Sequence, residues 1–219
     1  MAATTSGRGA SKVRAVIFDF GNVVSTVDTG RFLRKLADRS PLSIPRLSAE
    51  IYDSGLHARY EAGTISSPAF YRCVIARTGA EMPMPEFVAA YTDLFAPIAG
   101  TADLIRRLAS RYPVGLLSNT NPLHFRHHIR SSPPFPCFST VTLSYRVKTL
   151  KPDPRIYADA VSKLGVPAGA CVYIDDIPEY AEGARLAGLH GLTFAGVAKL
   201  EHDLLRLGVR TDETERQNA

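Results

Sequence analysis

Near its beginning the chain carries a short apolar stretch that ends in a single carboxylate. Residues 13–18 read Val-Arg-Ala-Val-Ile-Phe, and Asp19 follows them just before a Gly21-Asn22 turn. Runs of four to eight apolar, β-branched residues are typical of interior strands, and open α/β sheets bind ligands at the carboxyl ends of such strands. We therefore expect Asp19 to lie where a nucleophile or a metal ligand would lie, although an Asp after a strand can also simply begin a turn.

Three further segments bring polar side chains to the end of a strand or to the start of a helix. Two of them are short apolar runs, residues 114–117 and 171–174. The third is a basic loop in which two prolines mark the entry to a helix. In chain order the three segments supply a hydroxyl with a neighbouring amide, an ammonium group and a pair of carboxylates: Ser118 and Asn119, Lys151, and Asp175 and Asp176.

This set of side chains, in this order, resembles the four motifs of the haloacid dehalogenase superfamily, which are a nucleophilic Asp, a Ser or Thr, a Lys and an acidic pair. The likeness extends from residue 13 to about residue 209. It is nearest to a phosphatase branch whose first motif reads Asp-x-Gly-Asn and which includes sugar-phosphate phosphatases. The resemblance implies an α/β fold, with a Rossmann-like doubly wound parallel sheet and an inserted helical cap domain.

The resemblance also implies a Mg²⁺-dependent phosphatase that hydrolyses a small phosphorylated metabolite, such as a sugar phosphate. Asp19 would attack phosphorus to give an aspartyl-phosphate, which water would then hydrolyse. Ser118, Asn119 and Lys151 would hold the phosphoryl oxygens, with Lys151 as a point charge. Mg²⁺ prefers hard oxygen ligands and keeps several waters, so a few protein oxygens suffice. The expected metal ligands are Asp19, the backbone carbonyl of Gly21, Asp176, and Asp175 either as an alternative ligand or as a partner of the direct ligands.

One position departs from the common pattern. Most phosphatases of this superfamily carry a second Asp two residues after the nucleophile, as general acid and base, and this chain has Gly21 there. Such help is worth roughly 10²- to 10⁴-fold in rate. The enzyme must therefore obtain the help from another residue, be slow, or use substrates with good leaving groups. The candidate replacements are Asp28, His57 and Glu61, and we expect His57 and Glu61 to contact the substrate as well.

Two alternatives stay open on the sequence. A 2-haloacid dehalogenase would keep Asp19 as its nucleophile, but those enzymes work without metal and their fourth motif resembles Ser-x-Asn. A non-catalytic binding or regulatory protein on the same scaffold is favoured only by Gly21. The Asp175-Asp176 pair favours a metal-dependent enzyme, because adjacent carboxylates are costly unless a cation or solvent lies between them.

Periodicity divides the chain into an α/β core and a helical insertion. Between about residues 26 and 97 no strong strand is visible, and apolar residues recur at helical spacing. After residue 97 strands and helices alternate, which favours a parallel sheet with helices on both faces. The predicted strands are 114–117, 138–143, 172–174 and 189–194, and the predicted helices are 102–110, 155–164, 179–187 and 199–207. We expect a disordered tail over 1–12, a catalytic core over 13–25 and 98–209, a helical cap over 26–97 that closes over the nucleophile, and a frayed tail over 210–219.

Composition and charge bear on the size of the core and on the ligands that the chain can bind. The 219 residues, 45% of them hydrophobic, are enough for one core domain and a modest insertion. The net charge of +5 does not predict a nucleic-acid partner, because the densest basic stretch, residues 126–130, is short and lacks stacking aromatics. His124, His127 and His128 lack a fourth zinc ligand at a recognisable spacing, so we expect surface histidines.

The cysteine count and the length of the apolar runs bear on the compartment of the protein. Three cysteines, an odd number without a pairing pattern, indicate reduced thiols in a cytoplasmic protein. No run approaches 18 apolar residues, so we expect no membrane span. The expected partner is the small phosphorylated metabolite alone, bound by a monomer or a homodimer.

Overall fold

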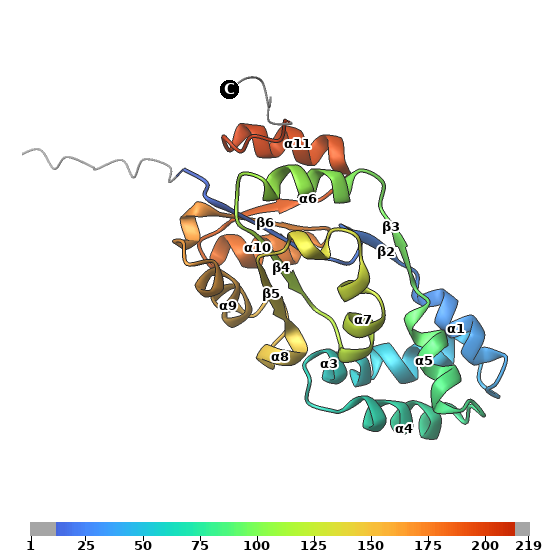
Figure 1. Cartoon of the computed structure of the whole chain (residues 1–219). Coiled ribbons are helices and arrows are strands. Elements are labelled where there is room, and N and C mark those ends of the chain that lie inside the picture. The colour runs from blue at the N-terminus through green and yellow to red at the C-terminus, as the bar shows by residue number, and fades with distance from the viewer. Residues whose placement is uncertain (1–11, 213–219) are drawn as a thin grey trace, which may run out of the picture.

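The computed structural model describes residues 12–212, and a five-stranded parallel sheet lies at the centre (Figure 1). In the order of the sheet its strands are β5 (Thr140–Leu143), β4 (Val114–Ser118), β1 (Ala15–Phe18), β6 (Cys171–Asp175) and β7 (His190–Thr193). The chain builds the sheet outward from β1 through β4 to β5, and then crosses to β6 and β7 on the other side. This doubly wound order confirms the predicted fold, and it places the carboxyl ends of β1, β4 and β6 side by side.

Helices cover both faces of the sheet because successive β1 side chains point to opposite sides. Val16 and Phe18 are buried with leucines of α6 (Thr101–Ala109) and α11 (Val197–Arg206). Ala15 and Ile17 are buried on the other face, against α9 (Pro154–Leu164) and α10 (Pro178–Leu186). Every strand and helix predicted after residue 97 is present, with each end within two residues of its predicted position.

A set of helices, the helical insertion, lies between the first strand and α6 and has its own hydrophobic core. Its members are α1 (Thr29–Ala37), α2 (Ile44–Ser48), a π-helical turn (Ala49–Asp53), α3 (Leu56–Glu61), α4 (Ser67–Thr78) and α5 (Met84–Thr92). Aromatic side chains dominate the centre, where Phe32, Phe70, Phe87 and Tyr91 are fully buried. Leu123 of α7 (Pro122–His127) belongs to the same cluster, so the core of the insertion includes a residue from the chain that follows β4.

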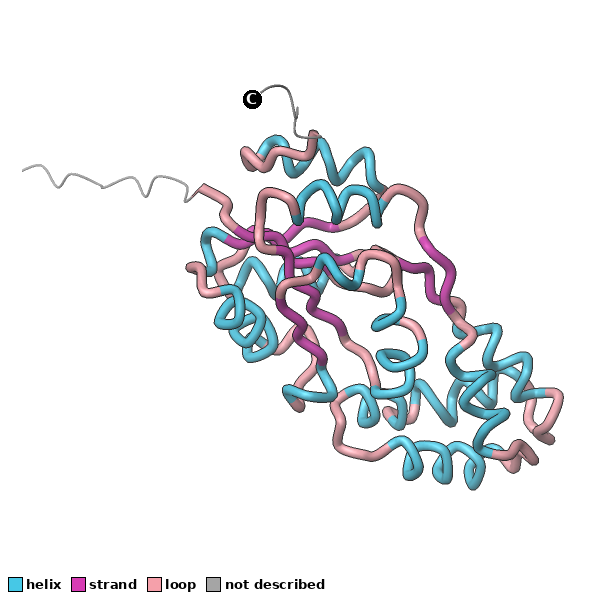
Figure 2. The backbone as a smooth tube through the Cα atoms, viewed as in Figure 1, coloured by secondary structure: helices cyan, strands magenta, loops and turns pink. Residues whose placement is uncertain are grey.

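Two short strands connect the insertion to the sheet. β2 (Ser25–Val27) and β3 (Phe95–Pro97) pair antiparallel, with Thr26 opposite Ala96, and they run beside each other toward the insertion (Figures 1 and 2). The expectation of no strong strand between residues 26 and 97 missed this pair. Three residues are too few to show the alternation by which strands are recognised.

Smaller expectations concern the cysteines, membrane spans and the two ends of the chain. The three cysteines are free, and Cys171 is buried in β6. Among the helices of residues 12–212, none is long and apolar enough to cross a membrane. The predicted N-terminal tail, apart from Lys12, lies outside the described residues, and so do residues 213–219 of the predicted C-terminal tail.

Candidate active site

One buried ammonium group bridges two carboxylates at the carboxyl edge of the sheet. Lys151 Nζ lies 2.9 Å from Asp19 Oδ1 and 2.6 Å from Asp175 Oδ2. The pairing of Phe18 with Ile174 in the neighbouring strands β1 and β6 brings the next residues, Asp19 and Asp175, together. The side chains of Lys151, Asp19 and Asp175 are 1%, 9% and 0% exposed, so water screens these charges poorly.

Asp175 is the most firmly held member of the group. Its Oδ2 accepts hydrogen bonds from Lys151 Nζ and from the hydroxyl of Tyr173, and its Oδ1 accepts from the backbone N–H of Ile177 at 2.9 Å. Both carboxylate oxygens are therefore engaged by protein donors. Tyr173 was not predicted as a site residue, because a tyrosine inside an apolar strand gives no signal beyond core packing.

Asp176 differs from its neighbour because it is only partly buried and, among residues 12–212, has one side-chain donor. Asn22 Nδ2 donates to Asp176 Oδ2 at 3.2 Å, while Asn22 Oδ1 accepts from the backbone N–H of Val27 at 3.1 Å. Asn22 adopts a left-handed conformation with φ 50°, which asparagine tolerates better than most residues. The Gly-Asn turn thus fixes an amide between Asp176 and the start of the insertion.

Burial is the largest single influence on the pKa values of these groups. Burial raises the pKa of Asp19 to about 7; Lys151 opposes this shift and Asp175 adds to it. Burial also raises the pKa of Asp176, with the Asn22 hydrogen bond acting against it. For Lys151, burial would lower the pKa, but the two carboxylates Asp19 and Asp175 outweigh it and the pKa is raised. Lys151 therefore stays charged, and the negative charge exceeds the positive charge at this edge.

The donor set fits a hard divalent cation. One carboxylate oxygen each from Asp19, Asp175 and Asp176 lies within 4.8 Å of the others. Asp19 Oδ1 is buried, and among the described residues its close polar partner is the Lys151 ammonium group at 2.9 Å. Three carboxylates around one ammonium group leave negative charge uncompensated, a costly arrangement that a further cation relieves. Mg²⁺ takes such oxygen ligands.

Ser118 and Asn119 lie at the end of β4, next to β1. The Ser118 hydroxyl is buried, and its only hydrogen bond in residues 12–212 is a long one of 3.4 Å to the Asn119 carbonyl. Asn119 holds the backbone of Lys151, because its Oδ1 accepts from Lys151 N at 2.9 Å and its Nδ2 donates to Lys151 O at 3.4 Å. The amide that follows β4 therefore positions the loop that carries the ammonium group.

A small cavity of about 90 Å³ lies where the insertion meets these loops. The two residues after Asp19 line it, together with the β4 loop and residues of the insertion: Phe20, Gly21, Val27, Thr29, His57, Glu61, Leu94, Phe95, Ser118, Asn119, Thr120, His124 and Ile129. The predicted substrate-contacting residues His57 and Glu61 thus share one cavity with Ser118 and Asn119. Asp28 does not line it: its side chain is 55% exposed and pairs with Arg34 at 3.2 Å.

Two polar residues near this cavity were not anticipated. Ser144, fully buried at the start of α8 (Ser144–Val147), donates to the Glu61 carbonyl at 2.6 Å and accepts from Thr120 N at 2.9 Å. His124 was expected at the surface, and that expectation is wrong, since the residue is 6% exposed. The sequence did carry a signal for the helix that contains His124. Asn121 and Pro122 predict the start of α7, because Asn is a preferred N-cap and Pro a preferred first residue of a helix.

The ring of His124 is held neutral in one tautomer. Its Nε2 lies 3.1 Å from the carbonyl of Tyr91, which can only accept, so Nε2 carries the hydrogen. Its Nδ1 then accepts from the side-chain amide of Asn121 at 3.0 Å. Burial, together with the proximity of His57, lowers the pKa of His124 to about 3.

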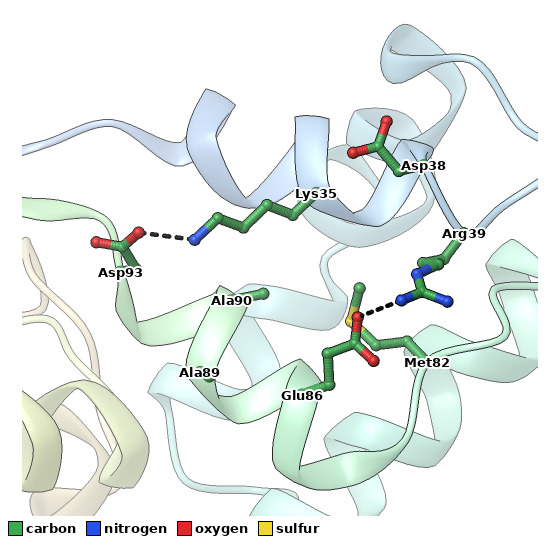
Figure 3. A pocket seen from close by; sticks show the side chains of 8 residues that line it. All are labelled: Lys35, Asp38, Arg39, Met82, Glu86, Ala89, Ala90 and Asp93. Carbon is green, nitrogen blue, oxygen red and sulfur yellow. Dashed lines mark hydrogen bonds and ion pairs between the residues drawn. The ribbon is translucent and has the colours of Figure 1, made fainter.

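A larger groove, of about 510 Å³, lies between α1 and α5 on the insertion (Figure 3). Its charged side chains pair with one another, Lys35 with Asp93 at 2.7 Å and Arg39 with Glu86 at 3.0 Å. None of the predicted site residues lines this groove. The smaller cavity beside Gly21 is therefore the better candidate for the substrate.

Comparison with known proteins agrees with this geometry. A family model described as haloacid dehalogenase-like hydrolase matches residues 13–188. A D-ribitol-5-phosphate phosphatase of Bacteroides thetaiotaomicron is 25% identical over 173 residues, which cover 75% of this chain and 83% of that protein. Phosphatase MT3486 of Mycobacterium tuberculosis is 34% identical over 107 residues, or 45% of this chain and 48% of the relative.

A solved structure shares the fold. The HAD family enzyme bt-2542 of Bacteroides thetaiotaomicron, in complex with magnesium and inorganic phosphate, has a TM-score of 0.74 at 22% identity, over 84% of this chain and 94% of that one. At this identity the likeness speaks for the fold alone, whereas the family model spans most of the chain. The predicted family and the predicted hydrolase class are thus confirmed, and the chain belongs to the haloacid dehalogenase-like hydrolases.

Proposed function

We propose that this protein is a Mg²⁺-dependent phosphatase that hydrolyses a small phosphorylated metabolite, such as a sugar or sugar-alcohol phosphate, through an aspartyl-phosphate at Asp19. The observation that carries the proposal is the meeting of three carboxylates with a single buried ammonium group at the carboxyl edge of the sheet. The relative that acts on D-ribitol 5-phosphate, and the related structure with magnesium and inorganic phosphate, support the same reaction type and cation.

In this mechanism Asp19 is the nucleophile. Its carboxylate oxygen forms a bond to phosphorus while the bond from phosphorus to the ester oxygen breaks, and the leaving oxygen takes up a proton. The Ser118 hydroxyl, whose one hydrogen bond within the described part of the chain is long, donates to a phosphoryl oxygen. Water then attacks the phosphorus of the aspartyl-phosphate, the bond between Asp19 and phosphorus breaks, and phosphate leaves.

The remaining residues hold the cation and the ammonium group that balance the negative charge of the phosphoryl group. Asp19, Asp176 and the backbone carbonyl of Gly21 would hold Mg²⁺, which when bound neutralises charge on the phosphoryl oxygens. Asp175 keeps Lys151 charged and in place through its hydrogen bond, and the ammonium group also draws the phosphoryl oxygens. Because both oxygens of Asp175 already accept hydrogen bonds, its part is to hold Lys151 rather than to bind the metal directly.

A panel of phosphorylated metabolites, assayed for phosphate release with Mg²⁺ and with EDTA, tests this proposal. We expect release from at least one sugar or sugar-alcohol phosphate, its loss in EDTA and its return with Mg²⁺. Asp19→Asn should abolish release while the fold is retained, and Asp38→Asn, at an exposed carboxylate, should not. Beryllium fluoride, which mimics a phosphoryl group on an aspartate, should inhibit the wild type.

Other outcomes would establish one of the alternatives. Metal-independent release of halide from 2-haloacids would make the protein a dehalogenase with the same nucleophile. Wild-type turnover in Asp19→Asn would remove this carboxylate from the mechanism. No release from any member of the panel, with no binding of beryllium fluoride, would favour a non-catalytic binding protein.

A further inference from the structure

The proposed reaction lacks a proton donor at its expected place, and the structure offers another. Gly21 has no side chain, although its backbone would admit one: its φ is not left-handed, and an added Cβ would lie 3.4 Å from Val27 Cγ2, an ordinary van der Waals contact. We propose that His57, oriented by Glu61, donates the proton to the leaving oxygen and later takes one from the attacking water. This inference rests on the proposed phosphatase function.

The two side chains are placed as an acid–base pair. They lie four residues apart on α3, and His57 Nδ1 is 3.7 Å from Glu61 Oε2. Both side chains line the small cavity that Gly21 and Ser118 also line. A carboxylate beside one ring nitrogen favours the tautomer that carries hydrogen there, which leaves Nε2 as the atom that exchanges protons with a substrate.

The His57 ring packs against the rings of Tyr52, Phe70 and Tyr91, but the polar atoms of the His57 and Glu61 side chains are not engaged by the rest of the described protein. The side chains of His57 and Glu61 are only 18% and 19% exposed. Within residues 12–212 they have no hydrogen-bond or ion-pair partner other than each other. A partly buried polar pair that lines a cavity and has no other partner in the described protein is available to a substrate.

Hydrogen bonds from Ser144 and Lys148 fix the end of α3, which carries His57 and Glu61, over the β4 loop. The Ser144 hydroxyl joins the Glu61 carbonyl to Thr120 N, two residues after Ser118. Just beyond α3, the Gly63 carbonyl accepts from Lys148 Nζ at 2.6 Å. Gly63 itself approaches α8 so closely that a Cβ there would overlap the Tyr145 carbonyl. The end of α3 is therefore held against the loops that carry the phosphoryl-binding groups, as a proton donor requires.

The other candidates do not meet these conditions. Asp28 is exposed, pairs with Arg34 and does not line the cavity. His124 lines it, but both of its ring nitrogens are engaged, one with the Tyr91 carbonyl and one with Asn121. Histidine is also the side chain best suited to give and take a proton near neutral pH.

The proton balance closes over the two steps. In the first step the ester bond breaks toward its oxygen, which takes the proton from the His57 imidazolium and leaves as an alcohol. In the second step neutral His57 accepts a proton from water as the water oxygen bonds to phosphorus. The electron pair of the broken bond returns to Asp19, and the imidazolium is restored.

Substrates with different leaving groups test the inference. An alkyl phosphate such as ribitol 5-phosphate or glycerol phosphate needs the proton, whereas p-nitrophenyl phosphate releases a stable anion without it. In saturating Mg²⁺ we expect His57→Gln to lower kcat/KM, which reports the steps up to release of the leaving group, by about 10²- to 10⁴-fold on the alkyl phosphates. On p-nitrophenyl phosphate the loss of kcat/KM should be less than about tenfold, which also shows that the variant is folded, while kcat on both falls where hydrolysis of the shared aspartyl-phosphate limits it.

Two further variants complete the design. Glu61→Gln keeps the backbone carbonyl that Ser144 binds, and it should show the same selective loss on alkyl phosphates to a smaller extent. His202→Gln, at an exposed histidine on α11, should match the wild type on both substrates.

Equal losses of kcat/KM on both substrate types, or a higher KM with unchanged kcat, would overturn proton donation by His57 and leave the proposed function standing. If the wild type released phosphate from no ester while Asp19→Asn behaved identically, the proposed function itself would fail, and this inference with it.

Discussion

At the scale of single residues, Asp19 shows how a reactive group costs stability. Its carboxylate is buried, shares one ammonium group with Asp175 and has a pKa raised to about 7, chiefly by burial. An unfolded Asp has a pKa near 3.9. The folded protein therefore binds this proton more tightly than the unfolded chain does, and stability falls as the pH rises from about 4 to about 7.

Asp19→Asn should accordingly be more stable than the wild type in the absence of divalent cations. We expect a gain of roughly 2–4 kcal/mol in the free energy of unfolding at pH 8, which shrinks as the pH is lowered toward 4. Urea titrations of both proteins at pH 4.5, 6 and 8 measure the difference. A gain in unfolding free energy that grows as the pH is lowered would contradict a raised pKa for Asp19.

The two adjacent carboxylates should respond differently to truncation. Asp175→Ala leaves Lys151 with one carboxylate and removes the acceptor of the Tyr173 hydroxyl, so it should cost about 3–5 kcal/mol of stability. Asp176→Ala removes only the Asn22 contact and should cost less than about 1 kcal/mol.

Thermal melts with and without Mg²⁺ test this pair. We expect Mg²⁺ to raise the melting temperature of the wild type and not that of Asp176→Ala. Equal destabilisation by the two variants would show that Asp175 does not anchor the ammonium group.

At the scale of elements, Ser144 couples α8 to the β4 loop and to the end of α3. Ser144→Ala removes the donor to the Glu61 carbonyl and the acceptor for Thr120 N, both in a buried site. Unsatisfied buried groups of this kind cost about 1–3 kcal/mol. We expect that loss in urea unfolding and a lower kcat, because Glu61 is no longer held over the cavity.

Ser162→Ala is the matched control, since Ser162 is exposed on α9. It should change stability by less than about 0.5 kcal/mol and leave kcat unchanged. A Ser144→Ala protein as stable and as active as this control would mean that the bridge contributes nothing.

The same elements show what the sequence could and could not predict. Asp19, Ser118 and Asp175 were predictable because each lies at or just after the end of an apolar strand, and strand order brings such ends together. β2 and β3 were missed because three residues carry no periodicity. The Ser144 bridge had no signal at all, because it depends on three segments that meet only in the folded chain.

At the scale of the whole molecule, the insertion and the sheet are joined by a mostly aromatic junction. The ring of Phe95, from β3, stacks on His128 at 4.2 Å, and Phe20 packs edge-on against both rings. Leu123 enters the core of the insertion from α7. Unfolding of one part therefore exposes apolar surface of the other, and we expect the two parts to unfold together.

His124 lies in this junction, where its ring stacks on Tyr91 at 4.4 Å, and it makes the whole fold sensitive to acid. Its pKa of about 3 lies below the value of about 6.5 for an unfolded histidine, so between these values the unfolded chain binds a proton that the folded protein does not. Stability is therefore lost as the pH falls from 6.5, by roughly 2–3 kcal/mol at pH 4.5 from this group alone.

We expect His124→Gln to flatten the decline of unfolding free energy over this range and His202→Gln to leave it unchanged, as measured by urea unfolding at a series of pH values. Parallel pH profiles for the wild type and His124→Gln would show that the ring is protonated without cost, and that the junction opens to water more readily than its burial implies.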